Sequence, residues 1–339
     1  MWVCRWLLVL ALLGTACAEG PSAGRGSAGP AETSPAEPGT RVFFAWTGQI
    51  TVVDIEAATS ETIQLRELAP VGLVRRGDHL VFGGDGTYAL DAQEPTGDPV
   101  LIAEDSWYFV PSANPDRVWV AVLDRKRSDA HHLVFSEIRE VTAEGQITAR
   151  GPAMGDAWMD GAAEAGVVFE SPEHDDLVVW DPMAQQVVRS FGNPPMGASH
   201  GNLVVWCDAW CPELHLTDVL TGAERIVQPP AGYDRFDGWS GEFTPDGRLF
   251  AVPVGNPPRY EGPGAAAIVD VATGDVTVIP GSEEEGGIPG LTWDPTGTRL
   301  FLVLGQHGRF ELRYFDVGAD GAQTAAVDPP QDLFAMASA

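Results

Sequence analysis

The chain has 339 residues, of which 20 are Lys or Arg and 48 are Asp or Glu, so its formal net charge at pH 7 is −28. This charge argues against the basic footprint of a nucleic-acid-binding protein. It also opposes attraction to an anionic membrane surface, so any membrane attachment is expected to come from an anchor. The length suits two ordinary domains or one large repeat domain.

The N-terminal segment has the pattern of an export signal. Arg5 precedes the short apolar run Trp6–Leu13, and small residues follow it. This arrangement is typical of a secretory signal peptide and is too short for a membrane span. Two cleavage routes fit. Cleavage after Ala18 would use an A-x-A-like site, whereas cleavage before Cys17 would leave an N-terminal cysteine for lipidation.

The residues before Cys17 resemble a bacterial lipobox, the cleavage motif of lipoproteins. The family pattern favours Leu three residues before the cysteine, whereas Leu13 lies four before it and Gly14 takes the expected place. Residues 18–40 contain no aromatic or branched aliphatic residue and cannot bury a core. We therefore expect residues 1–17 to be a signal peptide, 18–40 to be a disordered linker, and Cys17 to carry the lipid (palmitate). This places the protein on the outer side of the cell membrane, with plain secretion as the alternative.

The stretch Gly290–Asp328 shows the unit from which residues 41–339 are built. It contains four short runs rich in apolar and β-branched residues, separated by Gly, Pro and Asp. This pattern predicts a four-stranded antiparallel sheet, whose strands we name A to D. One such sheet cannot bury its own faces, so copies of it must stack.

An acidic residue marks the C–D turn of each copy. The first and last of these acids are Asp54 and Asp316, and the six intervals between them give a mean period of about 44 residues. A period of this size with four strands per repeat is typical of a propeller blade. Each Asp is expected to accept hydrogen bonds from the backbone of its own turn. The seven acids are Asp54, Asp91, Glu140, Asp181, Asp218, Asp270 and Asp316.

The sequence therefore predicts an all-β fold, a seven-bladed β-propeller of four-stranded antiparallel blades over residues 41–339. Glycines such as Gly161 and Gly241 occur in strand A, which is expected to line the crowded axis. The first copy lacks a strand A, whereas the run Leu333–Ala337 follows a complete seventh copy. We expect this C-terminal run to supply strand A of the first blade and to close the ring, because closure removes two exposed sheet edges.

The repeats resemble those of the WD40-like, TolB-like and YVTN-type propellers of bacterial exported proteins. The matching motifs are Thr244–Ala251, at an A–B turn, and Val269–Gly274, at a C–D turn. Trp180-Asp181 and Trp293-Asp294 lack the Gly-His partner of a true WD40 repeat. The resemblance covers residues 41–339 and implies the fold, whereas its motifs are structural and indicate little about function.

Three cysteines remain after removal of the signal, namely Cys17, Cys207 and Cys211. With Cys17 used for the lipid, we expect Cys207 and Cys211 to form a disulfide across the B–C loop of the fifth blade, as suits an oxidising compartment. A redox site would need a different spacing. A metal site would need further ligands beside His215.

The candidate binding rim lies where the B–C and D–A loops converge above the axis, which is where the propeller resemblance implies ligand binding. These loops hold the longest insertions and carry aromatic and charged side chains that suit a peptide or a sugar. The alternative is that the tryptophans pack between blades. The rim consists of Trp107, Trp158, Tyr233, Arg235, Trp239, Arg259, Tyr260 and Glu283.

The sequence favours an exported, lipid-anchored propeller that serves as a non-catalytic binding or scaffold module for an envelope protein, peptide or glycan. The alternative is a propeller enzyme, lactonase-like or lyase-like, with its site at the mouth of the axial channel. Such an enzyme would need several converging acids or histidines, and strand A offers Asp160 and Glu242 as isolated acids. The seven histidines form no paired metal motif and are expected at the surface. We expect no metal, no cofactor, no nucleic-acid partner, and a monomer whose membrane contact is its lipid.

Overall fold

The structure, a computed structural model, describes residues 40–338 apart from short gaps. The predicted signal peptide, Cys17 and all of the linker except Thr40 lie outside the described residues. The described residues form strands and turns but no helix, and hence no helix long and apolar enough to cross a membrane. The gaps are 47, 66–67, 69, 96–97, 129–132, 154, 156–157, 171–175, 192–196, 209, 238–240, 257–263, 285–286, 307–308 and 332–334.

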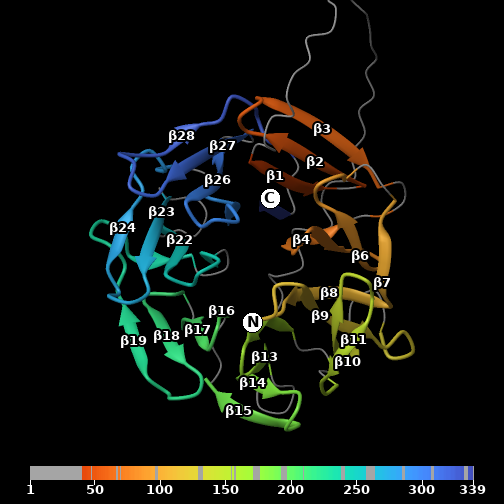
Figure 1. Ribbon diagram of the computed structural model, residues 1–339. Coiled ribbons are helices and arrows are strands. Elements are labelled where there is room, and N and C mark those ends of the chain that lie inside the picture. The colour runs from red at the N-terminus through yellow and green to blue at the C-terminus, as the bar shows by residue number, and fades with distance from the viewer. Residues whose placement is uncertain are drawn as a thin grey trace, which may run out of the picture. The chain divides into compact units, whose positions relative to one another are not determined.

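Seven antiparallel sheets surround a central axis, as Figure 1 shows, and the predicted seven-bladed β-propeller is confirmed. Blade 1 contains, from the axis outwards, β29 (Ala335–Ser338), β1 (Arg41–Trp46), β2 (Gln49–Asp54) and β3 (Thr59–Gln64). Blade 2 contains β4 (Val71–Arg76), β5 (His79–Gly83), β6 (Gly86–Asp91) and β7 (Val100–Glu104). Blade 3 contains β8 (Ser106–Pro111), β9 (Arg117–Leu123), β10 (Phe135–Thr142) and β11 (Ile147–Arg150).

Blades 4, 5 and 7 follow the same order. Blade 4 contains β12 (Met159–Ala163), β13 (Gly166–Glu170), β14 (Leu177–Asp181) and β15 (Gln186–Ser190). Blade 5 contains β16 (Gly197–His200), β17 (Leu203–Trp206), β18 (Leu214–Asp218) and β19 (Glu224–Val227). Blade 7 contains β25 (Gly290–Trp293), β26 (Arg299–Gln306), β27 (Arg309–Asp316) and β28 (Gln323–Thr324).

Blade 6 departs from the predicted pattern at its inner strand, which is divided into two short pieces. These pieces, β20 (Arg235–Phe236) and β21 (Glu242–Phe243), both pair with β22 (Leu249–Gly255). The outer strands are β23 (Gly264–Asp270) and β24 (Val276–Val278).

The hydrophobic core lies between blades. Seven buried clusters fill the seven blade–blade interfaces, one in each. Successive residues of a strand point to opposite faces, so Phe43 of β1 packs toward blade 2 while Phe44 packs toward blade 7. Likewise, Phe250 of β22 packs toward blade 5 and Ala251 toward blade 7. Each blade is therefore buried on both faces, as the repeat pattern predicts.

The C-terminal strand closes the ring, which confirms the prediction. Strand β29 pairs with β1 in antiparallel register, from Val42 opposite Ser338 to Ala45 opposite Ala335. Of the predicted run, residues 333 and 334 lie outside the described residues. The Ser338 hydroxyl donates a hydrogen bond to the carbonyl of Trp293 in blade 7. Blade 1 thus contains both the first and the last described strand of the propeller.

The C–D turns behave as predicted in five of seven blades. The Asp54 carboxylate accepts a hydrogen bond from Ala57 N at 2.7 Å, and that of Asp218 accepts one from Thr221 N at 2.7 Å. The hydrogen bonds from Thr221 lower the pKa of the Asp218 carboxyl, because they favour its charged form. Asp91, Asp181 and Asp270 likewise accept hydrogen bonds from backbone NH groups of their own turns. The prediction fails at Glu140, which accepts from Ser112, Arg117 and Thr148, and at Asp316, which pairs with Arg299.

Crowding bears on two glycines near the axis, Gly161 in β12 and Gly241 just before β21. A Cβ atom on Gly241 would lie 2.1 Å from the ring of buried Phe250, and one on Gly161 would lie 2.7 Å from Ser199 Oγ in blade 5. A larger residue at position 241 would displace the buried Phe250 ring, whereas one at position 161 would require the Ser199 hydroxyl to rotate away. This finding agrees with the interpretation of strand A as the crowded one.

Removal of residues 335–339 tests ring closure. The deletion leaves β1 with an unpaired edge and uncovers the clusters on both sides of blade 1. We expect a loss of about 3 kcal/mol or more in the free energy of unfolding and aggregation through the open edge, measured by calorimetry and light scattering. The control is Ser338→Ala, which keeps the strand and should cost about 1 kcal/mol. A truncated chain with the melting temperature of the full chain would contradict closure by β29.

Candidate functional site

The strand directions define two faces of the ring. Consecutive strands of a blade run in opposite directions, so the B–C and D–A loops lie on one face, which we call the loop face. The A–B and C–D turns lie on the other, which we call the turn face. Of the predicted rim, Trp158, Tyr233, Arg235 and Glu283 are described. Trp239, Arg259, Tyr260 and the side chain of Trp107 lie outside the described part of the chain.

Trp158 makes the contacts of a residue that packs between blades. Its ring meets those of Tyr108 and Phe135 edge-on, with centroids 5.1 and 5.9 Å away. Tyr108 and Phe135 belong to the interface of blades 3 and 4, where the Tyr108 hydroxyl donates to the carbonyl of Met159. These contacts match the packing alternative raised from the sequence.

Three other rim residues lie on the loop face near blades 5 and 6. Tyr233 packs against the cluster between these blades, and both burial and the Glu283 carboxylate raise the pKa of its hydroxyl. Glu283 is exposed and accepts a hydrogen bond from Gly281 N at 2.8 Å. Arg235 begins β20 and is half-buried. The structure thus brings an aromatic ring and two charges to one part of the predicted rim.

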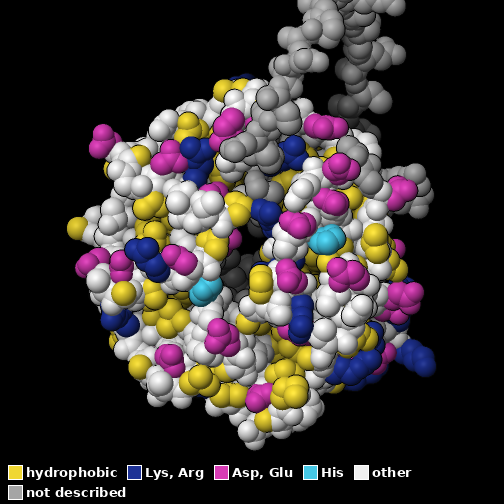
Figure 2. Space-filling model, in the orientation of Figure 1, with side chains coloured by type: hydrophobic (Ala, Val, Ile, Leu, Met, Phe, Trp, Pro, Cys, Tyr) yellow, Lys and Arg dark blue, Asp and Glu magenta, His cyan; other side chains and the backbone are white. Residues whose placement is uncertain are grey.

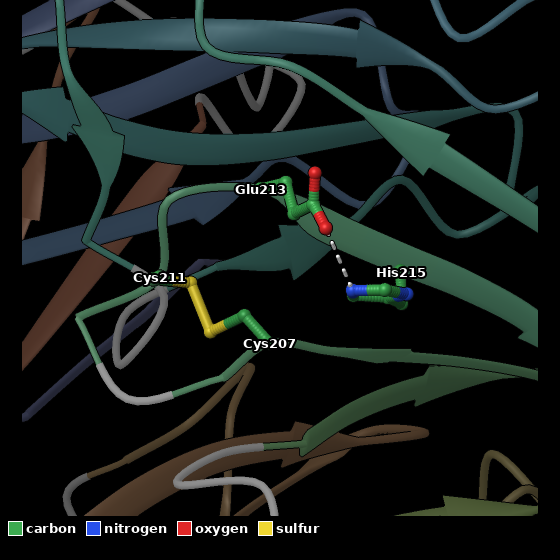
Figure 3. Close-up of a disulfide and its surroundings, with 4 residues drawn as sticks. All are labelled: Cys207, Cys211, Glu213 and His215. Carbon is green, nitrogen blue, oxygen red and sulfur yellow. Dashed lines mark ion pairs between the residues drawn. A yellow bond between two sulfur atoms is a disulfide. The ribbon is translucent and has the colours of Figure 1, made fainter.

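The predicted disulfide is confirmed and lies in the same region. Cys207 and Cys211 are bonded, with Cα atoms 5.0 Å apart, and Figure 3 shows the loop that they close between β17 and β18. Both cysteines are buried in the cluster between blades 5 and 6. The Cys211 carbonyl accepts a hydrogen bond from Phe236 N at 3.0 Å. The loop is therefore fixed to the core at its base.

Trp210 lies in this disulfide-closed loop, and the sequence reasoning missed it. Its side chain is 68% exposed. Its φ is 79° and that of Cys211 is 50°, a left-handed backbone that non-glycine residues rarely adopt. Strained conformations of this kind persist where the surroundings impose them, and they cluster at ligand sites. The available signal was a tryptophan between two close cysteines in a loop-face segment.

His215 contradicts the expectation that every histidine lies at the surface. It is buried against Trp206, with parallel rings whose centroids are 4.0 Å apart. Its Nδ1 lies 3.1 Å from Glu224 Oε1. Figure 3 shows the second ion pair, in which its Nε2 lies 3.5 Å from Glu213 Oε1. The pairing of β17 with β18 places Trp206 opposite His215. His215 is therefore a buried strand residue that stacks on Trp206 and lies between two carboxylates.

A second polar region lies at the axis. Arg76 ends inner strand β4 of blade 2, and Glu242 begins inner strand β21 of blade 6, on the far side of the ring. Figure 2 shows an opening at the centre of the ring with basic and acidic side chains beside it. Both residues lie next to A–B turns and hence at the turn-face end of the axis. Glu242 was noted from the sequence as an isolated acid, whereas Arg76 was not.

Burial shifts the pKa of both axial residues. Desolvation raises the pKa of Glu242 to about 7, against the opposing effects of Thr292 and Arg76. Desolvation lowers the pKa of Arg76 to about 10, against the attraction of Glu242 and Asp116. The Thr292 hydroxyl lies 3.5 Å from Glu242 Oε1. The axis thus holds a carboxyl that titrates near neutral pH and a guanidinium that remains charged.

His200 lies at the same turn-face end of the axis. Burial lowers the pKa of its imidazole despite the nearby Asp246 and Glu164 carboxylates, and its ring lies 5.7 Å from that of Phe243. Asn202 donates to Glu164 at 2.9 Å and links blades 4 and 5. Among the described residues, no group of three or more His, Cys, Asp or Glu is arranged to hold a metal ion.

Comparison with protein-family models and with curated protein sequences finds no match. Solved structures do match. A functionally unknown protein from Desulfotomaculum acetoxidans DSM 771 aligns with a TM-score of 0.58 at 10% identity, over 88% of this chain and 98% of its own. A protein from Bacteroides fragilis NCTC 9343, provisionally assigned as a 6-phosphogluconolactonase, aligns with 0.56 at 12% identity, over 91% and 100%. TolB from Acinetobacter baumannii aligns with 0.52 at 12% identity, over 89% and 66%.

These comparisons define the class of the chain as a β-propeller. The chain spans 66% of the length of the TolB chain that it matches. TM-scores of 0.52–0.58 at identities of 10–12% show a shared fold alone, and propellers host many functions. The likeness therefore selects neither a binding role nor an enzymatic one.

Glu242→Gln tests the charge state at the axis. The unfolded chain releases the Glu242 proton near the ordinary pKa of 4.5, whereas the folded chain keeps it until about pH 7. Because the folded state binds more protons in this window, its stability falls as the pH rises through it. The variant lacks this loss and should be more stable than the natural chain at pH 8, by up to about 3 kcal/mol, and about equal at pH 4.5.

The measurement is the melting temperature of both proteins from pH 4.5 to 8. His200 is present in both proteins, so the difference between the two curves isolates Glu242. Parallel curves would show that the Glu242 carboxyl is ionised throughout.

Proposed function

We propose that this chain is an exported, lipid-anchored binding module that holds a protein or peptide partner at the cell envelope through its loop face. The signal-like N-terminus and Cys17 support export and anchoring. The composition of residues 18–40 supports a flexible tether with an end-to-end distance of about 25–30 Å. Such a tether would let the propeller reach a partner above the membrane surface.

Trp210 is the observation that carries the proposed binding role. Large aromatic side chains provide much of the affinity at protein interfaces. An anchor that is already fixed in position also loses less conformational entropy on binding. The disulfide and the bond from Phe236 N to Cys211 O hold the base of the loop, while 68% of the Trp210 side chain stays open to solvent.

The charge around this anchor favours a basic partner. Asp208 in the same loop and Glu283 on the D–A segment between blades 6 and 7 are both exposed. The whole chain carries a formal charge of −28. Complementary charge speeds encounter and disfavours wrong partners. A partner segment that offers an apolar pocket flanked by Lys or Arg matches these features.

The same fold occurs in protein assemblies. A chain of the mitotic checkpoint complex aligns with a TM-score of 0.52 at 13% identity, over 86% of this chain and 96% of its own. This is a likeness of fold, and it agrees with a binding role without identifying a partner.

Trp210→Ala tests the binding role. Loss of a central aromatic anchor typically costs about 2 kcal/mol or more of binding free energy. The apparent affinity for the partner retained from detergent-solubilised envelope should therefore fall about 30-fold. The matched control is Met183→Ala, because Met183 is 87% exposed and lies in a C–D turn on the turn face. Quantitative mass spectrometry would identify proteins retained by the natural chain and the control. Equal retention by Trp210→Ala would contradict binding through the loop face.

Cys17→Ser tests the anchor separately. The variant should lose incorporation of labelled palmitate and leave the detergent-extractable membrane fraction. Cys4→Ser, which alters a cysteine inside the predicted signal peptide, should keep both properties. Unchanged labelling of Cys17→Ser would contradict lipidation and leave the loop-face proposal to its own test.

A further inference from the structure

We propose that Arg76 and Glu242 form a binding site for a carboxylate group at the turn-face end of the axis. This site is independent of the loop-face function, because it lies on the opposite face and uses other residues. It is formed by ring closure, since its two principal side chains come from inner strands of blades on opposite sides of the axis.

Arg76 has hydrogen-bonding capacity that the described residues leave unused. Its Nε atom is buried and has no hydrogen-bond partner among the residues that the structure describes. The preceding residue, Arg75, differs, because its Nε donates to the Gly77 carbonyl at 3.0 Å. A buried donor without a partner costs about 1–3 kcal/mol, and more for a charged group. A ligand that accepts from Arg76 would recover this free energy.

Glu242 attracts Arg76 without pairing with it. The two charges influence each other, and yet no hydrogen bond or ion pair joins them among the described contacts. The strands packed against β21 are β16 and β25, which bring His200 and Thr292 to its sides. Asp116, in the A–B turn of blade 3, is the other acid that acts on Arg76. The two axial groups therefore attract each other without a direct hydrogen bond or ion pair among the described residues.

A carboxylate suits this pair. The planar guanidinium donates two parallel hydrogen bonds to a carboxylate, and the protonated Glu242 carboxyl can donate a third. A dianion such as phosphate would place its second charge near Asp116 and Glu242 and is disfavoured by repulsion. The ligand class is thus a monocarboxylate, supplied either by a small organic acid or by the C-terminus of a peptide.

The test is titration calorimetry of the full chain at constant ionic strength. Acetate is the probe for a small acid, and acetamide is its neutral control. N-acetyl-Ala-Ala with a free carboxylate is the probe for a peptide terminus, and its C-terminal amide is the control. We expect saturable binding of the acids and none of the amides. A peptide acid that binds at least ten-fold more tightly than acetate identifies a peptide terminus, whereas equal affinities identify a small acid.

Variants separate the site from general charge effects. Arg76→Gln should weaken binding at least ten-fold, whereas Arg75→Gln removes the same charge one position away and should change it less than two-fold. Both should keep the circular dichroism spectrum of the natural chain. If Arg76→Gln does not fold, Arg76→Lys, which keeps the charge and loses the planar fork, takes its place and should also weaken binding.

The pH dependence gives a second readout. Affinity for acetate should be higher at pH 5.5, where Glu242 is neutral, than at pH 8, where its charge repels the ligand. Glu242→Gln should bind equally at both values. Absence of saturable binding by both acids, equal losses in Arg75→Gln and Arg76→Gln, or a pH dependence that survives in Glu242→Gln would each overturn the proposal.

Discussion

Burial of both faces of each sheet against its two neighbours is the constraint on which this structure depends. The seven hydrophobic clusters lie in the seven interfaces, so no blade has a core of its own. Strand β1 illustrates the consequence, because Phe43 and Phe44 belong to different interfaces. A blade without a neighbour would expose one of these phenylalanine side chains. The propeller therefore has to close, and β29 closes it by pairing with β1.

Closure also determines which side chains meet at the axis. Seven inner strands converge there, and side chains link neighbouring ones, as when Trp293 Nε1 donates to the Glu242 carbonyl at 3.1 Å. Convergence brings charged residues from distant parts of the chain together and buries them. Arg76 and Glu242 acquire their shifted pKa values in this way. The loop of Trp210, by contrast, is held by a local bond, the disulfide between Cys207 and Cys211 that closes it.

The repeat pattern made the fold predictable from sequence, because it arises from local rules. Turn acids such as Asp54 and Asp270 bond to their own backbone, and alternating strands bury alternate faces. Both effects recur at a fixed period. The closing strand followed from counting, since one copy lacked a strand and another had one in excess.

The site was less predictable, because its residues depend on contacts that no local pattern encodes. Arg76 looked like an ordinary turn residue, and only closure places it opposite Glu242. Trp210 depends on a left-handed backbone conformation that its residue type does not favour. The division of the inner strand of blade 6 into β20 and β21 likewise has no signal in the spacing. Trp158, which the sequence placed on the candidate rim with packing between blades as the alternative, contacts Tyr108 and Phe135.

Native-state hydrogen exchange read by mass spectrometry tests the closed ring most directly. Because β29 and β1 share one ladder inside a single cooperative ring, peptides that cover residues 335–338 and 41–46 should show equal protection. That protection should approach the level of the central strands of the other blades. Fast exchange of residues 335–338 beside a protected β1, or fast exchange of both beside protected blades 2 to 7, would contradict a propeller that is closed by its C-terminal strand.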